Sequence, residues 1–150
     1  MEKENIPGRN GENEERKTAD FEPRSLEVGA AVIVQNGRIL IAQRREGDSY
    51  GGFWEFPGGK RKPGENMPEC LRRELMEELG IEAEAGKLWK IVEYASPERI
   101  LRLHFYFCRI TGGEPAALGC QACRWVAPGE LRNFRFPPAD LEIIAELSGL

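Results

Sequence analysis

Apolar, β-branched and aromatic residues gather in short runs separated by polar turns, which is the pattern of a sheet. The five runs are residues 26–34, 38–45, 87–96, 100–110 and 123–126. Asn36-Gly37 separates the first two runs, and this dipeptide favours a tight hairpin because both residues tolerate positive φ. A polar turn at 96–99 joins the third run to the fourth, so a second hairpin is expected there.

A different period governs residues 65–80, where leucines recur every four positions as on one face of a helix. The leucines are Leu71, Leu75 and Leu79. Asn66 with Glu69 three residues later predicts a capping box at the start of this helix, and Gly80 predicts its end. The pattern at 137–150 (PPADLEIIAELSGL) predicts a second, terminal helix.

Several strands with one central and one terminal helix predict a mixed α/β domain over residues 25–150. Residues 1–24 are polar with few apolar side chains, so we expect a flexible leader, because such a segment cannot bury enough surface to offset its ordering entropy. The loop at 46–65 is rich in Gly and Pro and long for a compact domain. Long ordered loops are usually functional, so a site is expected there.

The net charge of −4 and the lack of a basic stripe argue against binding of long nucleic acid. A phosphate-bearing ligand would therefore need local Arg or Lys side chains or a bound cation. No apolar run is long enough to span a membrane, and the charged first residues lack the apolar stretch of a signal peptide, so we expect a cytoplasmic protein. In that compartment the four cysteines are expected to be thiols.

Crowded carboxylates mark the predicted central helix. Glu74, Glu77 and Glu78 have the i, i+3 and i+4 spacing that puts side chains on one helix face, where like charges repel. A divalent cation would remove the repulsion, and oxygen ligands suit Mg²⁺, Mn²⁺ or Ca²⁺ rather than zinc. The alternative is a solvated acidic face that binds nothing.

The residues around this cluster form a longer pattern. Gly58-Gly59 precede the helix, where glycines let backbone groups approach a ligand closely. Glu65 lies before the helix, and Arg73 is next to Glu74. The string over residues 59–81 reads G-x5-E-x7-R-E-L-M-E-E-L-G-I. It resembles the Nudix box, G-x5-E-x7-R-E-U-x-E-E-x-G-U with U a bulky aliphatic residue, at every fixed position.

Resemblance to the Nudix family implies an α/β/α sandwich with a mixed sheet in a single domain. It also implies hydrolysis of a nucleoside diphosphate linked to another group, with Mg²⁺ or Mn²⁺ as cofactor. The implied metal ligands are Glu74, Glu77, Glu78 and the carbonyl of Gly58. Arg73 would serve catalysis by holding the loop and helix in shape together with Glu65, and Gly59 and Gly80 would be structural. Glu74 is expected to accept the proton of the attacking water, with Glu77 or Glu78 as alternatives.

Three further runs resemble the MutT branch of this family: Arg44-Arg45, residues 55–60 (EFPGGK) and residues 136–139 (FPPA). That branch sanitises nucleotide pools by cleaving oxidised purine triphosphates such as 8-oxo-dGTP to the monophosphate and pyrophosphate. The resemblance implies a small-molecule nucleotide as partner, no membrane, and a monomer or homodimer. The implied substrate-binding residues are Arg45, Glu55, Phe56, Lys60, Arg99 and Asp140.

Two positions depart from the MutT pattern. Asp140 stands where Asn is common, and a carboxylate only accepts hydrogen bonds. This suits the donor-rich edge of guanine or the 4-amino group of cytosine, while the alternative is that Asp140 caps the terminal helix. Gly119 stands where a Glu often assists metal binding or accepts a proton. Glu114 is a weak substitute, so activity is expected to rest on the helix carboxylates or to be slow.

The sequence leaves other functions open. Because the box serves the diphosphate and not the base, the alternatives include hydrolysis of ADP-ribose or another nucleoside-diphosphate sugar, or of CTP or dCTP. A nucleotide-binding module that has lost turnover is a third alternative, supported only by Gly119. Cys120 and Cys123 lack the further ligands that zinc needs, and we interpret them as packing residues.

Overall fold

The computed structural model describes residues 24–149, so the predicted leader lies outside the described residues except for its last position. Within that range the elements follow in the order β1 (Arg24–Gln35), β2 (Arg38–Gln43), β3 (Trp54–Glu55), β4 (Gly58–Lys60), α2 (Met67–Leu79), β5 (Glu82–Ala95), β6 (Arg99–Gly112), β7 (Ala122–Val126), the 3₁₀ helices η1 (Pro128–Asn133) and η2 (Pro138–Asp140), and α3 (Leu141–Leu147).

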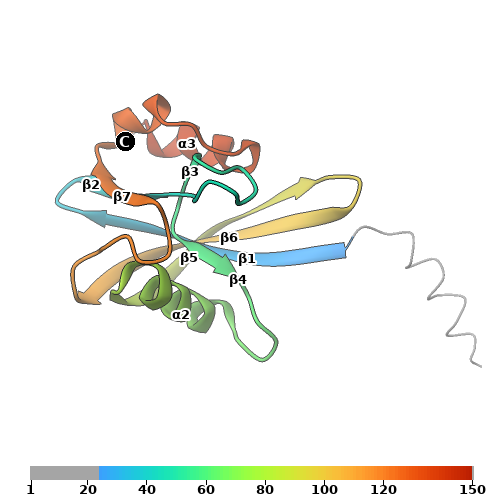
Figure 1. Ribbon diagram of the computed structural model, residues 1–150, viewed down its shortest axis with the longest axis horizontal. Helices are drawn as coiled ribbons and strands as arrows, with labels where there is room; N and C mark the ends of the chain where they lie inside the picture. Colours follow the sequence, from blue (N-terminus) through green and yellow to red (C-terminus); the bar gives the residue numbers. More distant parts are fainter. Residues whose placement is uncertain (1–23, 150) are drawn as a thin grey trace, which may run out of the picture.

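The strands form one mixed sheet with a helix on each face (Figure 1). The strand order is β3-β2-β1-β6-β5, with β4 paired to β1 and β7 paired to β2. Strands β1 and β6 run parallel, whereas the other pairs are antiparallel. The predicted α/β/α sandwich is therefore confirmed.

Both predicted hairpins are confirmed. Asn36 and Gly37 have φ of 52° and 76°, as a tight turn between β1 and β2 requires. Strands β5 and β6 pair antiparallel up to Ala95↔Ile100. The Ser96 N–H donates to the Arg99 carbonyl over 2.9 Å and closes the turn.

Each helix closes a separate hydrophobic layer. The layer under α2 contains Leu71, Leu75 and Leu79, which are at most 1% exposed, so burial of each stabilises the fold by about 1.5–3 kcal/mol. The opposite layer contains Ile143, Ile144 and Leu147 of α3 with alternate residues of β1 and β6. Because strand side chains alternate between faces, Ala30 and Val32 point to α3, whereas Ala31 and Ile33 point to α2.

Helix α2 has the predicted ends. The Asn66 side chain accepts from the Glu69 N–H over 2.8 Å, and the Glu69 carboxylate accepts from the Asn66 N–H over 2.9 Å. This is the predicted capping box. At the other end Gly80 has φ of 68° and donates to the carbonyls of Leu75 and Met76.

Three segments differ from the sequence prediction. The loop 46–65 contains β3 and β4, which are too short to show a period. Strand β5 begins at Glu82, five residues before the expected start at 87, with register shifts that interrupt its alternation. The terminal helix begins with the 3₁₀ turn η2, and α3 covers only Leu141–Leu147, because Pro137 and Pro138 cannot donate to a helical ladder.

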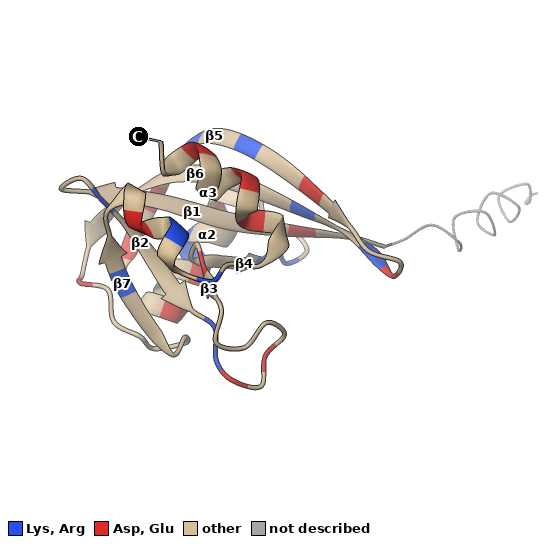
Figure 2. Cartoon of the chain, turned by 90° about the horizontal axis from the view of Figure 1, so that it is seen from above, with Lys and Arg blue, Asp and Glu red and all other residues tan. Residues whose placement is uncertain are grey.

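Charges of both signs are interspersed over the view in Figure 2, without a continuous basic strip. No helix in the range 24–149 is long and apolar enough to cross a membrane.

Replacing Asn66 by Ala should lower the free energy of unfolding by about 1 kcal/mol, because one capping acceptor is lost at the start of α2. Urea denaturation measures this change. Asn66→Asp keeps an acceptor at the same place and should lose clearly less; equal losses in the two variants would contradict a role for the side-chain acceptor.

Candidate active site

Arg73 is the centre of the polar network between α2 and the preceding loop. Its Nε and Nη2 donate to the two carboxylate oxygens of Glu65 over 2.5 and 3.0 Å. Nη2 also donates to the Lys60 carbonyl over 3.1 Å, and Nη1 donates to Glu74 over 2.9 Å and to Glu77 over 3.1 Å. The hydrogen bonds from Arg73 lower the pKa of Glu65 to about 2. Arg73 thus ties the loop to the helix and holds two of the predicted metal ligands.

Glycines at 58 and 59 allow the backbone of β4 to approach two neighbours closely. A Cβ on Gly59 would collide with the carboxyl carbon and both oxygens of Glu74. A Cβ on Gly58 would collide with the carbonyl of Gly29, because β4 pairs with β1 at this point. The Glu74 carboxylate therefore rests directly on the Gly59 backbone, and a side chain at position 59 would have to displace it.

Burial perturbs the carboxylates at this junction. Burial, together with repulsion from Glu55 and Glu74, raises the pKa of Glu78 to about 8. The Glu78 Oε1 atom is buried without a hydrogen-bond partner. Burial also raises the pKa of Glu55, although Arg44 forms an ion pair with it over 2.7 Å. The pKa of Glu74 is likewise raised by burial, against the opposing effect of Arg73.

The groups between β4 and α2 that could bind a metal fit a divalent cation. They offer oxygen atoms only, which Mg²⁺ and Mn²⁺ prefer, and they include the unpartnered Glu78 Oε1. Within residues 24–149, no three His, Cys, Asp or Glu side chains converge as a preformed metal cage. The Glu77 side chain is 54% exposed and, like Glu74, is hydrogen-bonded to Arg73. The carboxylates would have to turn from Arg73 to bind a cation together.

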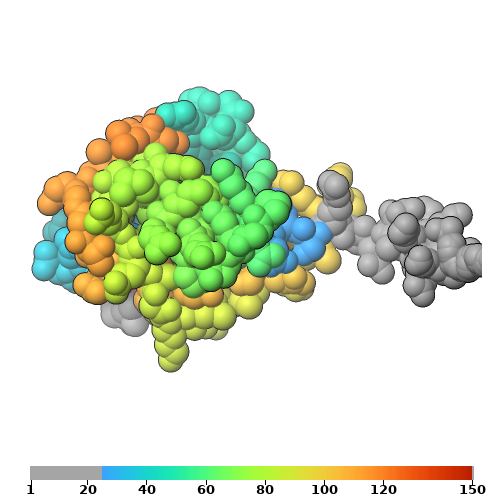
Figure 3. Space-filling model, turned by 90° about the horizontal axis from the view of Figure 1, so that it is seen from below, coloured from blue at the N-terminus to red at the C-terminus, as the bar shows by residue number. Residues whose placement is uncertain are grey.

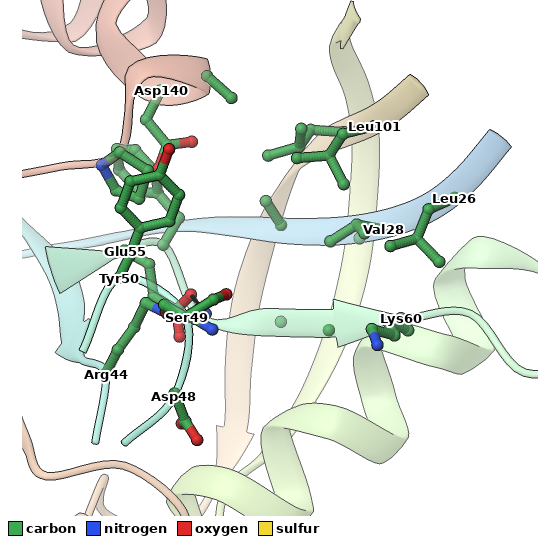
Figure 4. A pocket seen from close by; sticks show the side chains of 18 of the residues that line it. Leu26, Val28, Arg44, Asp48, Ser49, Tyr50, Glu55, Lys60, Leu101 and Asp140 are labelled. Carbon is green, nitrogen blue, oxygen red and sulfur yellow. Dashed lines mark hydrogen bonds and ion pairs between the residues drawn. The ribbon is translucent and has the colours of Figure 1, made fainter. Parts of the chain in front are cut away.

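A cavity of about 340 Å³ opens beside the buried acids, a volume typical of small-molecule sites. Figure 4 shows it from close by, with Glu55 and Asp140 towards one end and Leu26 and Leu101 towards the other. Its apolar walls include Leu26, Val28, Phe56, Leu101 and Leu103.

All six predicted substrate-binding residues line this one cavity, although they come from five separate parts of the chain. They are Arg45, Glu55, Phe56, Lys60, Arg99 and Asp140. Phe56 is also part of the core, since it is 4% exposed and packs against Phe105 and Phe136. Gly58 and Glu78 line the cavity as well, whereas Glu74 and Glu77 do not, so Glu78 is the acid of α2 that shares this space with the predicted substrate residues.

Asp140 is buried and faces this cavity. It occupies the position before α3, but its side chain forms no capping hydrogen bond, so the interpretation of Asp140 as a helix cap is wrong. The backbone there continues from the 3₁₀ turn η2 rather than from the extended conformation that a cap needs. Burial, with a smaller contribution from Glu55, raises the pKa of Asp140 to about 7.

Gly119 lies against the C-terminal end of α2. Its N–H donates to the Glu78 carbonyl over 2.9 Å, and a Cβ there would lie 3.2 Å from the Glu78 Cα. The loop that carries Gly119 borders α2 in the space-filling view of Figure 3, where it is orange beside the green helix. Glu114 is exposed and does not line the cavity, so it does not replace the missing loop carboxylate in this arrangement.

Two residues of the 44–53 loop belong to the site although neither was among the predicted substrate-binding residues. Arg44 pairs with Glu55 and donates to the Ser49 carbonyl over 2.6 Å. Tyr50 lines the cavity although it is 46% exposed. The sequence signal that could have indicated Tyr50 is that it is an aromatic residue inside a long Gly-rich loop.

The cysteines form no disulfide among the described residues. Cys120 lines the cavity, and burial raises the pKa of its thiol to about 11, so this thiol is protonated at neutral pH. Trp54 packs edge-on against Phe134 and does not line the cavity. Neither residue needs a ligand to explain its position.

Known proteins resemble this chain over most of its length. A family model described as NUDIX domain matches residues 29–146. A CTP pyrophosphohydrolase of Escherichia coli is 37% identical over 85% of this chain and 94% of its own. An 8-oxo-dGTP diphosphatase of Haemophilus influenzae is 38% identical over the same shares. The solution structure of the E. coli ORF135 protein superposes with a TM-score of 0.73, at 36% identity, over 85% of this chain and 91% of that chain.

Glu78→Gln should raise the free energy of unfolding at pH 8 by about 1–3 kcal/mol, because an ionised carboxylate is then no longer buried without a partner. The folded-state pKa of about 8 lies above the ordinary 4.5, so ionisation of Glu78 costs the wild type stability as the pH rises between these values. The gain should therefore vanish near pH 4.5.

Urea denaturation in the presence of a metal chelator, from pH 4.5 to pH 8, measures this dependence. The exposed Glu114→Gln variant serves as control and should follow the wild type throughout. A gain for Glu78→Gln that does not change with pH would contradict the assignment to ionisation.

Proposed function

Because this chain belongs to the Nudix family, we propose that it is a metal-dependent nucleoside triphosphate pyrophosphohydrolase that releases a monophosphate and pyrophosphate. The proposed substrates are (d)NTPs with a donor-rich base edge, with oxidised purine triphosphates such as 8-oxo-dGTP first and CTP or dCTP second. The observation that carries the proposal is the shared cavity. It brings the buried acids Glu55 and Glu78, four basic side chains and the Asp140 carboxyl into one space.

Glu74, Glu77 and Glu78, with the backbone of Gly58, are the residues that would hold the divalent cation. When bound, Mg²⁺ or Mn²⁺ neutralises phosphate charge and lowers the pKa of a bound water. Which of the two ions serves is part of the proposal.

The chain's own residues supply the remaining steps. Arg45, Lys60 and Arg99 line the cavity and are assigned to the phosphates and the nucleotide, because a protein of net charge −4 attracts anions only locally. Arg73 holds the Glu74 carboxylate at Oε2 over 2.9 Å, and we assign Glu74 to accept the proton of the attacking water. Burial raises the pKa of Glu74, which makes its carboxylate a better base.

Asp140 supports the preference for a donor-rich base edge. Its ionised carboxylate only accepts, so it matches N1–H and the 2-amino group of guanine, or the 4-amino group of cytosine. The two relatives reported above are named for CTP and 8-oxo-dGTP, and these nucleotides carry bases of the two kinds. The second candidate, CTP, therefore rests on the same residue as the first.

A substrate panel tests the proposal. Purified protein with Mg²⁺ or Mn²⁺ is given 8-oxo-dGTP, unmodified dGTP, dCTP, CTP, dATP, dTTP and ADP-ribose, and pyrophosphate and phosphate release are measured separately. Pyrophosphate from the guanine or cytosine nucleotides supports the proposal. Preference for ADP-ribose, or absence of turnover on the whole panel, would contradict it.

Glu78→Gln should lower turnover by about a hundredfold or more, although the same change is expected to stabilise the fold. Steady-state kinetics with saturating metal measures the loss. Glu114→Gln should keep wild-type turnover, because Glu114 lies outside the cavity. An equal loss in both variants, or none in Glu78→Gln, would contradict the assigned roles.

Asp140→Asn should reduce kcat/KM for guanine and cytosine substrates about tenfold relative to adenine and thymine substrates, because an amide presents a donor as well as an acceptor. The wild-type preference should strengthen as the pH rises through about 7, where Asp140 loses its proton. The Asp140→Asn preference should not change over that range, and a parallel pH dependence in both proteins would contradict base reading by Asp140.

A further inference from the structure

Tyr50 has a backbone conformation that side chains normally avoid. Among the described residues, only Asn36 and Tyr50 have positive φ without being glycine. The tight hairpin explains Asn36. Tyr50, with φ of 56°, lies in the loop between the antiparallel strands β2 and β3, at the third position of the turn Asp48–Gly51, which the Gly51 N–H closes by donating to the Asp48 carbonyl over 3.0 Å. Glycine is the usual residue for this conformation, and two glycines follow directly in the sequence. A turn of this kind calls for a positive φ at its third position, but it does not require a tyrosine there.

The surrounding loop holds this conformation from both sides. The Phe53 N–H donates to the Tyr50 carbonyl over 3.0 Å, and the two rings meet edge to face with centroids 5.2 Å apart. The guanidinium of Arg135 lies over the Phe53 ring at 4.8 Å. The loop is also pinned where Gly52 donates to the Arg44 carbonyl over 2.9 Å. The Tyr50 ring is therefore presented by a fixed loop.

The Tyr50 ring stands at the end of the cavity that carries Asp140. Figure 4 shows Tyr50, Glu55 and Asp140 together at one end, away from Leu26 and Lys60. Tyr50 is 46% exposed although it lines the cavity, whereas Phe56 is buried in the core. The ring of Tyr50 thus has surface to offer to a ligand.

We infer that Tyr50 stacks on the nucleobase whose edge Asp140 reads, and that it is a specificity-determining residue for planar aromatic bases. This inference rests on the proposed function, because it assumes a nucleotide in the cavity. Aromatic rings stack on any base through its face, and stacking commonly changes affinity by about tenfold or more. Tyr50 would then supply affinity for the base, while Asp140 selects among bases.

The test uses the full chain with four changes. Tyr50→Gly removes the ring and at the same time relieves the positive φ; Tyr50→Phe keeps the ring and removes the hydroxyl. Tyr94→Leu is the matched comparison, because Tyr94 lines the same cavity and is 41% exposed but pairs with Leu101 at the other end. Asp140→Asn alters base reading without removing a ring.

Titration calorimetry with a nucleoside monophosphate and, separately, with magnesium pyrophosphate measures binding of the base and of the phosphates. We expect Tyr50→Gly to weaken monophosphate binding about tenfold and to bind pyrophosphate as the wild type does. KM for the triphosphate should rise similarly, with kcat within about twofold. Tyr50→Phe should stay close to the wild type, and Tyr94→Leu should lose less than Tyr50→Gly.

Wild-type monophosphate affinity in Tyr50→Gly would overturn the inference, as would an equal loss of pyrophosphate binding or a larger loss in Tyr94→Leu. Thermal unfolding distinguishes a packing role, since a Tyr50 that only supports Phe53 would lower the unfolding temperature without a selective loss of base affinity. Binding of the monophosphate does not depend on turnover. If the wild type binds nucleotide but hydrolyses no triphosphate, the proposed function is contradicted, whereas the inference about Tyr50 is still decided by the binding data.

Discussion

The carboxylates of Glu55, Glu74 and Glu78 lie close together next to the hydrophobic core, and burial raises the pKa of each. Charges so placed are costly unless they are paired. Arg44 and Arg73 offset part of this cost by donating to Glu55 and Glu74, while one oxygen of Glu78 has no partner. The remaining deficit of positive charge is the property that a divalent cation would satisfy.

This arrangement depends on how tightly the backbone packs around α2. Strand β4 pairs with β1 while β1 also pairs with β6, so the segment before the helix lies on the sheet itself. Gly58 permits that approach, because a side chain there would collide with the Gly29 carbonyl of β1. Arg73 then ties the far side of the loop through Glu65. The same leucine stripe that anchors α2 in the core therefore also positions its acids.

Different parts of the cavity are lined by acidic, basic and apolar side chains. Buried acids lie at one wall, basic side chains come from three different elements, and apolar residues of β1 and β6 form the rest. Asp140 and Tyr50 come from segments about ninety residues apart in sequence, yet both line this space. A nucleotide has the same division into phosphates, sugar and base, which is why the proposed function fits the cavity as a whole.

Local signals in the sequence determined the hairpin at Asn36-Gly37, the ends of α2 and its buried leucines, since these depend on turn and capping chemistry between near neighbours. The motif spacing likewise brought out the acids of α2 and their Arg, because helix periodicity converts spacing into a shared face. Family resemblance led to the six predicted substrate-binding residues, and the structure places all of them around one cavity.

Only the tertiary structure decided what depends on contacts between distant segments. Strands β3 and β4 are too short to carry a period and exist because β2 and β1 offer partners. Asp140 matched a cap by sequence position, but packing turned its side chain into the cavity. The burial that raises the pKa of Glu78 likewise arises only when segments far apart in the chain close around the same space.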